Sequence, residues 1–84
     1  MDRKRVKKRV IIGQRYWFTS FGFEFEVEVT EPANMETMMC KVKYIKILNE
    51  DEVTGNVLSL LPDIKALISN GTITPMWVHN LRKL

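Results

Sequence analysis

A strict alternation of apolar and polar residues runs from Phe21 to Thr30, and it constrains the fold more than any other feature of this 84-residue chain. A period of two places the two sets of side chains on opposite faces of a β-strand. We therefore expect a strand over residues 21–30, with one face buried and the other in water. The apolar set is Phe21, Phe23, Phe25, Val27 and Val29, and the polar set is Gly22, Glu24, Glu26, Glu28 and Thr30.

Residues 39–48 are the predicted partner of this strand. Apolar residues take alternate positions from Cys40 to Tyr44, and the alternation then slips by one residue at Ile45. A slip of this kind is what a β-bulge produces. Opposed charges across an antiparallel pair contribute about 0.2–1 kcal/mol each, so the pairing is favoured by lysines that would face the three glutamates. These lysines are Lys41, Lys43 and Lys46.

Shorter elements are predicted on both sides of this pair. Residues 9–12 and 15–18 indicate a first strand with three consecutive β-branched residues, interrupted at Gly13, because glycine inside a strand often marks a bend. Residues 31–38, which include a proline and an asparagine, predict a loop. Residues 57–60 predict a further short strand.

One helix is predicted over residues 61–70. Pro62 suits the first helical turn, and Asn70-Gly71 provides a left-handed stop. Beyond the helix we expect a brief strand at residues 72–73 and a short helix over 75–84. The apolar stripe of the first helix has the spacing i, i+3, i+4, i+7 and consists of Leu60, Leu61, Ile64, Leu67 and Ile68.

This order of elements predicts one mainly β (α+β) domain over residues 9–84. Short antiparallel strands in a chain of this size cover a core most readily when the sheet curls on itself. We therefore expect a small, strongly bent antiparallel sheet or an SH3-like barrel, with one helix in the C-terminal half. An open α+β sheet with the helix on one face is the alternative. Since small domains often gain stability by association, a homo-oligomer is compatible with this reading.

Charge is distributed unevenly along the chain. The first fifteen residues hold seven of its 13 basic residues and one of its 10 acidic residues. Residues 1–8 combine dense like charge with no apolar periodicity, so we expect them to form a disordered basic arm. A dense cationic arm on a mildly acidic body most often meets a polyanion, because its charges act together on phosphates and release their counterions.

The arm therefore predicts a nucleic-acid-binding protein of low sequence specificity, with RNA or DNA as its partner. Aromatic side chains beside the arm could stack on unpaired bases, which slightly favours RNA. The predicted phosphate-binding residues are Arg3, Lys4, Arg5, Lys7, Lys8 and Arg9, with Arg15, Tyr16, Lys41 and Lys43 as further candidates.

Catalysis is not expected. His79 is the only histidine and has no evident carboxylate partner, and Cys40 is the only cysteine. A row of equivalent glutamates on one strand face lacks the unequal environments that catalytic carboxylates need. We therefore predict no enzyme activity, no metal and no cofactor. The basic start precedes only three apolar residues, so neither a signal peptide nor a membrane helix is expected. A lone thiol favours a reducing compartment, the cytoplasm.

Three segments of the chain carry a family resemblance: Ile12-Gly13-Gln14-Arg15-Tyr16-Trp17 and the stretches 55–60 and 64–73. They resemble small SH3-like barrel proteins common in bacteriophages. The resemblance implies a barrel, a phage origin and hence the host cytoplasm. Phage proteins of this kind bind nucleic acids or inhibit host factors, so the alternative function is a protein-interaction module that binds an acidic protein surface. A methionine-rich loop, Met35, Met38 and Met39, would suit that role.

Overall fold

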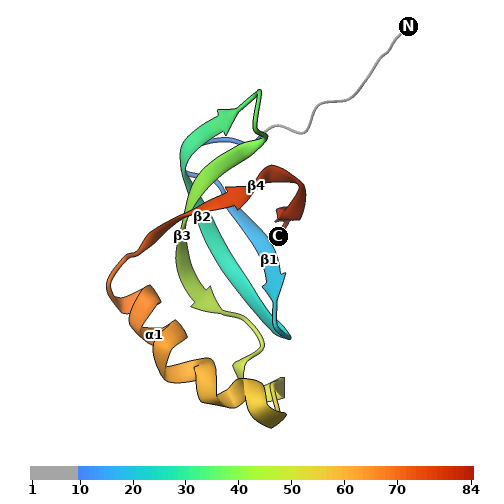
Figure 1. Ribbon diagram of the computed structural model, residues 1–84, viewed down its shortest axis with the longest axis vertical. Helices are drawn as coiled ribbons and strands as arrows, with labels where there is room; N and C mark the ends of the chain where they lie inside the picture. The colour runs from blue at the N-terminus through green and yellow to red at the C-terminus, as the bar shows by residue number, and fades with distance from the viewer. Residues whose placement is uncertain (1–9) are drawn as a thin grey trace, which may run out of the picture.

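The computed structural model of the protein describes residues 10–84, and the predicted arm lies outside these residues (Figure 1). Five strands form one antiparallel sheet in the order β4-β3-β2-β1-β5, so the protein is mainly β with a single short α-helix among the described residues. The elements are β1 (Arg15–Ser20), β2 (Phe23–Asn34), β3 (Met39–Ile47), the 3-10 helices η1 (Glu50–Glu52) and η2 (Gly55–Leu60), α1 (Leu61–Ser69), β4 (Ile73–Trp77), the 3-10 helix η3 (Val78–Asn80) and β5 (Arg82–Lys83).

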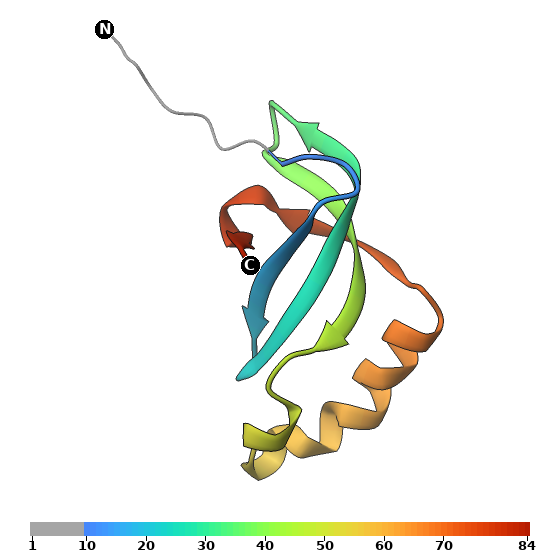
Figure 2. The same ribbon diagram turned by 180° about the vertical axis from the view of Figure 1, so that it is seen from behind.

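The sheet is bent around its core. β4 and β5 are its two edges, yet they follow one another in the chain and only residues 78–81 separate them. Both views show the sheet curling so that the C-terminal segment passes from the β4 edge to β1 (Figures 1 and 2). A link this short forces the two edges together at one end of the sheet.

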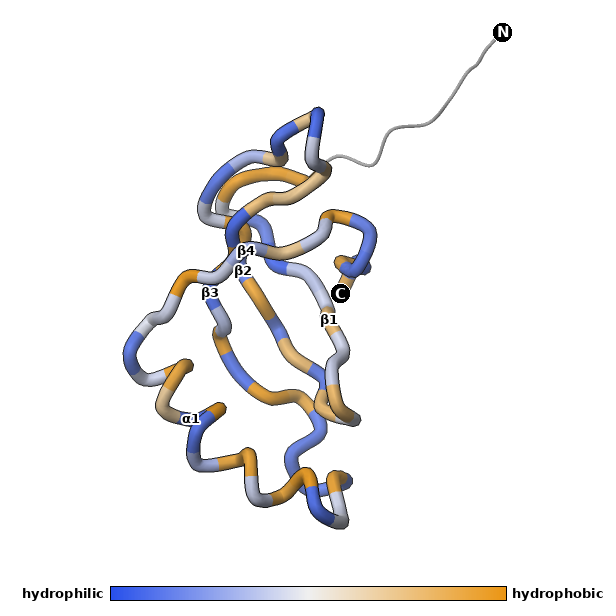
Figure 3. Tube along the Cα trace, in the orientation of Figure 1, coloured by the Kyte–Doolittle hydropathy of each residue, from blue (hydrophilic) through white to orange (hydrophobic). Residues whose placement is uncertain are grey.

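The alternation in β2 is confirmed. Phe23, Phe25, Val27 and Val29 are buried, the intervening glutamates are half-buried, and the tube coloured by hydropathy shows the alternation along β2 and β3 (Figure 3). The predicted strand began two residues too early, however. Phe21 and Gly22 have φ values of 54° and 84° and form the two-residue turn between β1 and β2. Positive φ at both central residues is typical of a type I′ hairpin turn, which matches the twist of the strands.

The predicted bulge in β3 is also confirmed. Glu26 pairs with Lys46 and Val27 pairs with Tyr44, which leaves Ile45 as the extra residue. Both Tyr44 and Ile47 pack against the core, although residues three positions apart in a regular strand would face opposite sides of the sheet. The extra residue therefore keeps the core side chains of both halves of β3 on the same face of the sheet.

Three local predictions near the ends of strands are wrong. Residues 10–12 form no strand: Ile11 and Ile12 are exposed, and only Val10 packs against the core. Residues 57–60 lie in η2 rather than in a strand. The loop predicted over 31–38 is shorter, because β2 continues to Asn34 through register shifts that accommodate a proline in the ladder.

The predicted terminal helix over 75–84 is wrong as well. Residues 73–77 instead form β4, which pairs with the first half of β3. Across the η3 link, Val78 and Leu81 are fully buried. The sheet edge offers this segment a row of backbone hydrogen bonds, and pairing with that edge outweighs the local preference for a helical spacing.

α1 occupies the predicted helical span and ends where Gly71 adopts a φ of 65°. None of its residues is fully buried, although Leu61 and Ile64 pack against the core. No helix among residues 10–84 has the length and apolar character needed to cross a membrane. The core consists of Tyr16, Phe23, Phe25, Val27, Val29, Cys40, Val42, Val53, Met76, Val78 and Leu81.

Candidate nucleic-acid interface

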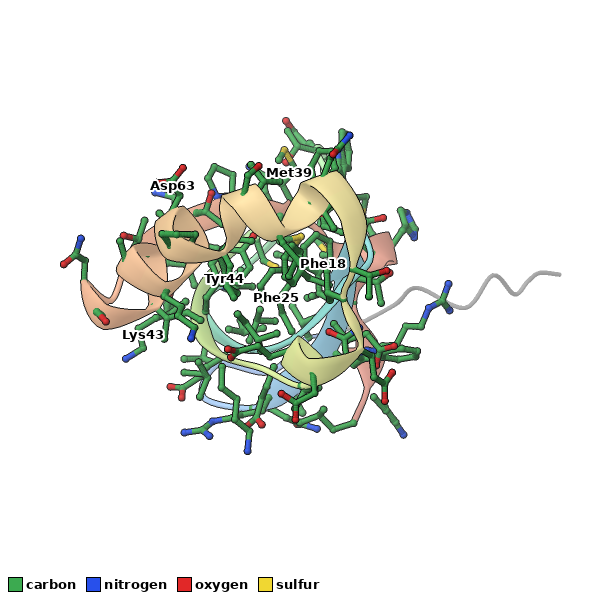
Figure 4. The ribbon with its side chains drawn as sticks, turned by 90° about the horizontal axis from the view of Figure 1, so that it is seen from below. Phe18, Phe25, Met39, Lys43, Tyr44 and Asp63 are labelled. Carbon is green, nitrogen blue, oxygen red and sulfur yellow. The ribbon has the colours of Figure 1, made fainter. Side chains whose placement is uncertain are left out.

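The outer face of β3 and β4 brings two lysines and one aromatic side chain together. Directly opposed residues of an antiparallel pair share a face, and here Met39 is opposite Trp77, Lys41 is opposite Pro75, and the next pair is Lys43 with Ile73. The alternate residues of both strands, such as Cys40 and Met76, are buried. In the view from below, Lys43 points away from the core, whereas Phe25 and Tyr44 lie between the sheet and α1 (Figure 4).

Trp77 is the residue of this face that sequence reasoning missed. Its side chain is 52% exposed, although tryptophan usually buries much of its ring. The sequence placed Trp77 on a helix, and only the pairing of β4 with β3 shows it beside the lysines. Lys41 is its diagonal neighbour across the ladder, and in antiparallel sheets such neighbours are roughly 7–8 Å apart. An exposed indole next to lysines can stack on a base while the ammonium groups contact phosphates.

Lys41 and Lys43 keep much of their charge available. The Nζ of Lys41 lies 3.7 Å from a carboxylate oxygen of Glu31, with both side chains at least half exposed. Exposed pairs of this kind contribute little, because water and salt screen them. Lys43 forms no ion pair with any residue in the described range 10–84. Both lysines can therefore exchange their present surroundings for a phosphate at small cost.

Arg15, by contrast, is already occupied. Its guanidinium donates to Glu26 at 2.8 Å and to Glu28 at 3.4 Å, in the middle of the outer face. The hydrogen bond to Glu26 is the main reason that the pKa of Arg15 is raised above its ordinary value. Glu26 also lies 3.9 Å from Lys46. The centre of the outer face is therefore a charge-balanced network, and Arg15 is a weaker candidate for phosphate than the sequence predicted.

Tyr16 is a correction to the predicted site. Its side chain is 5% exposed and lies in the core, so its ring cannot stack on a base. The hydroxyl instead accepts a hydrogen bond from the backbone N–H of Ile11 at 3.2 Å. The alternation along β1 turns this ring inward, whereas Arg15 and Trp17 lie on the outer face. The six arm residues of the predicted site, Arg3, Lys4, Arg5, Lys7, Lys8 and Arg9, lie outside the described residues.

The described part of the chain offers no arrangement for metal binding. No three His, Cys, Asp or Glu side chains of residues 10–84 gather closely enough to hold an ion. Cys40 is buried, its thiol lies 3.7 Å from the carbonyl oxygen of Met76, and burial raises the pKa of the thiol. A protonated, buried thiol is a poor nucleophile. That the protein is not an enzyme stays a prediction.

Comparison with protein-family models, curated protein sequences and solved structures gives no match to this chain. The resemblance to phage SH3-like barrels therefore stays a prediction.

Proposed function

We propose that this protein is a non-enzymatic nucleic-acid-binding protein of low sequence specificity that acts in the cytoplasm. The basic arm and the outer face of β3 and β4 together bind the nucleic-acid strand. The observation that carries the proposal is the exposed Trp77 on the same face as Lys41 and Lys43. The unbalanced charge of the first fifteen residues supports it independently.

The proposed partner is single-stranded nucleic acid, with RNA preferred to DNA. A single exposed aromatic ring on a β surface can stack only on a base that has left a duplex, and each such contact is worth about 1–3 kcal/mol. The described lysines of this face are on strands rather than on a helix shaped for the major groove. They would follow the backbone of a single strand and read no particular sequence.

The same proposal includes an SH3-like barrel. Two features of the sheet support a barrel. The first strand, β1, lies beside the last, β5, and the edge strands β4 and β5 are linked by the single 3-10 turn η3. Closing such a bent sheet would cover the backbone of both edge strands. Long-range nuclear Overhauser effects between β4 and the β1–β5 pair would support closure, and their absence in an assigned spectrum would favour an open sheet.

Binding of a fluorescently labelled, unstructured oligonucleotide tests the function. We expect Trp77→Ala to weaken single-strand binding by about 5-fold to 150-fold, which corresponds to one stacked base. The matched control is Ile73→Ala, which shortens an equally exposed apolar side chain on the same strand and should leave the affinity nearly unchanged. A duplex of the same length should bind through charge alone and be insensitive to both substitutions.

Salt dependence tests the contribution of the arm. If the arm makes five or six phosphate contacts, log K should fall with log salt at a slope of about −3.5 to −4.2 on single strands, and removing residues 1–8 should flatten it. Affinity that neither salt nor the deletion changes would contradict the proposal. A stoichiometric protein partner recovered from nuclease-treated lysate, with no nucleic-acid affinity, would instead favour an inhibitor of a host factor.

A further inference from the structure

A hydrogen-bonded turn with two apolar side chains precedes β1. The N–H of Gln14 donates to the carbonyl oxygen of Ile11 at 3.0 Å, and Gly13 has a φ of 85° at the third position of this four-residue turn. Such a turn is typical of type II, with Gly13 at the position that requires positive φ. Ile11 and Ile12 are 61% and 57% exposed on it. The turn therefore presents two adjacent isoleucines to solvent.

The turn is held in place by the sheet. Gly13 donates to the carbonyl oxygen of Val29 at 2.8 Å, and Val29 donates back to Gln14 at 3.1 Å. A third hydrogen bond joins the N–H of Ile11 to the buried hydroxyl of Tyr16. An apolar element that is already ordered loses little conformational entropy when it binds. Three basic residues, Lys7, Lys8 and Arg9, precede the turn in the sequence.

An apolar groove of about 230 Å³ lies at the other end of the molecule, between the tip of the β1–β2 hairpin and α1. The view from below shows this end, with Tyr44 and Phe25 between the helix and the sheet (Figure 4). Phe21 and Leu67 line the groove and are 73% and 40% exposed. Its lining includes Phe21, Phe23, Leu60, Asp63, Ile64 and Leu67.

The charge of this end is acidic. Asp63 lines the groove and forms no ion pair with another described residue. η1, with three consecutive acidic residues, lies at the same end of the molecule, and Lys65 there is already paired with Glu50 at 2.8 Å (Figure 1). An apolar ligand with basic neighbours would therefore suit the groove better than a neutral or acidic one.

We infer that the groove receives the Ile11–Ile12 turn of a second copy of this chain. The turn supplies two preordered apolar side chains preceded by basic residues, and the groove supplies an apolar surface with an unpaired acid. The turn and the groove lie at opposite ends of the described molecule, so one copy cannot fill its own groove (Figures 1 and 2). Groove-to-groove pairing would bring two Asp63 carboxylates into one small interface with no base of either groove to balance them, which like-charge repulsion disfavours. This contact does not use Trp77, Lys41 or Lys43 of the proposed nucleic-acid interface.

Sedimentation equilibrium of the purified, nuclease-treated and salt-washed protein tests the inference. A small contact predicts weak association, so concentrations up to about 1 mM are needed. The wild-type mass should rise above that of the monomer with concentration. Ile12→Asp removes the turn's apolar contact, and Leu67→Asp places a second carboxylate in the apolar groove. Each variant alone should stay monomeric. Mixed, the two should form a complex, because one keeps its groove and the other keeps its turn.

Met35→Asp is the matched control, because Met35 is 54% exposed and belongs to neither surface. It should associate like the wild type. The inference is overturned by a monomeric wild type, by either single variant associating as the wild type does, or by a mixture that stays monomeric. Thermal melts establish that each variant is folded. Leu67→Asp should keep its oligonucleotide affinity, so the failure of self-association and the failure of nucleic-acid binding are separate results.

Discussion

At the scale of single residues, Phe21 has an unfavourable backbone conformation, with a φ of 54°. A bulky residue rarely adopts positive φ, and the left-handed conformation costs about 1–2 kcal/mol for a residue with a Cβ. Its ring is mostly exposed, so burial of the ring stabilises the fold little. We expect Phe21→Asn to raise the free energy of unfolding by about 1 kcal/mol, because Asn-Gly is the preferred pair for this turn. Urea unfolding of the dilute monomer measures the change. Phe21→Ala keeps the backbone penalty and should not stabilise.

Two weakly acidic side chains, the buried Cys40 and the half-buried Tyr44 that packs against the core, predict the behaviour at high pH. Burial raises the pKa of both side chains above their ordinary values of 9.0 and 10.0. The unfolded chain therefore loses these protons more readily than the folded chain, so stability is complete below pH 9 and falls as the pH rises through the raised values. We expect the urea midpoint to drop between pH 9 and pH 11. In Cys40→Val the thiol no longer contributes, so the drop should be smaller; an equal drop would contradict this assignment.

At the scale of elements, the η3 link holds the two edges of the sheet together. Leu81 follows η3 and is fully buried, whereas Leu84 is 63% exposed three residues later. Shortening a buried leucine to alanine typically costs 2–5 kcal/mol, because the core closes over the cavity only in part. We therefore expect Leu81→Ala to destabilise the fold by about that amount. Leu84→Ala should change the free energy of unfolding by less than about 0.5 kcal/mol, and equal effects would place the link outside the core.

At the scale of the whole molecule, the charge of the chain and its core belong to different segments. Seven of the 13 basic residues precede Tyr16, whereas every residue of the buried core lies at or after it. Deleting residues 1–8 should therefore leave the melting temperature nearly unchanged and remove most of the affinity for nucleic acid. Calorimetry and oligonucleotide titration of the same preparation measure both. A variant that melts at a much lower temperature would show that the arm contributes to the fold.

The sequence by itself determined the parts of this protein that follow from local side-chain order. The alternation in β2 and the bulge at Ile45 are confirmed, because a period of two and its interruption act directly on which face a side chain occupies. The helix that ends before Gly71 follows equally from local spacing and from a glycine stop.

Only the tertiary structure decided what the C-terminal segment and the candidate interface are. Residues 73–77 pair with β3, thirty or more positions away in the chain, and the backbone hydrogen bonds that β3 offers leave no trace in the local pattern. The same pairing exposes Trp77 beside Lys41, and the alternation along β1 buries Tyr16, which local sequence could not settle. The physical reason is that a strand's neighbours and its buried face are set by partners distant in the chain, whereas its existence is set by its own residues.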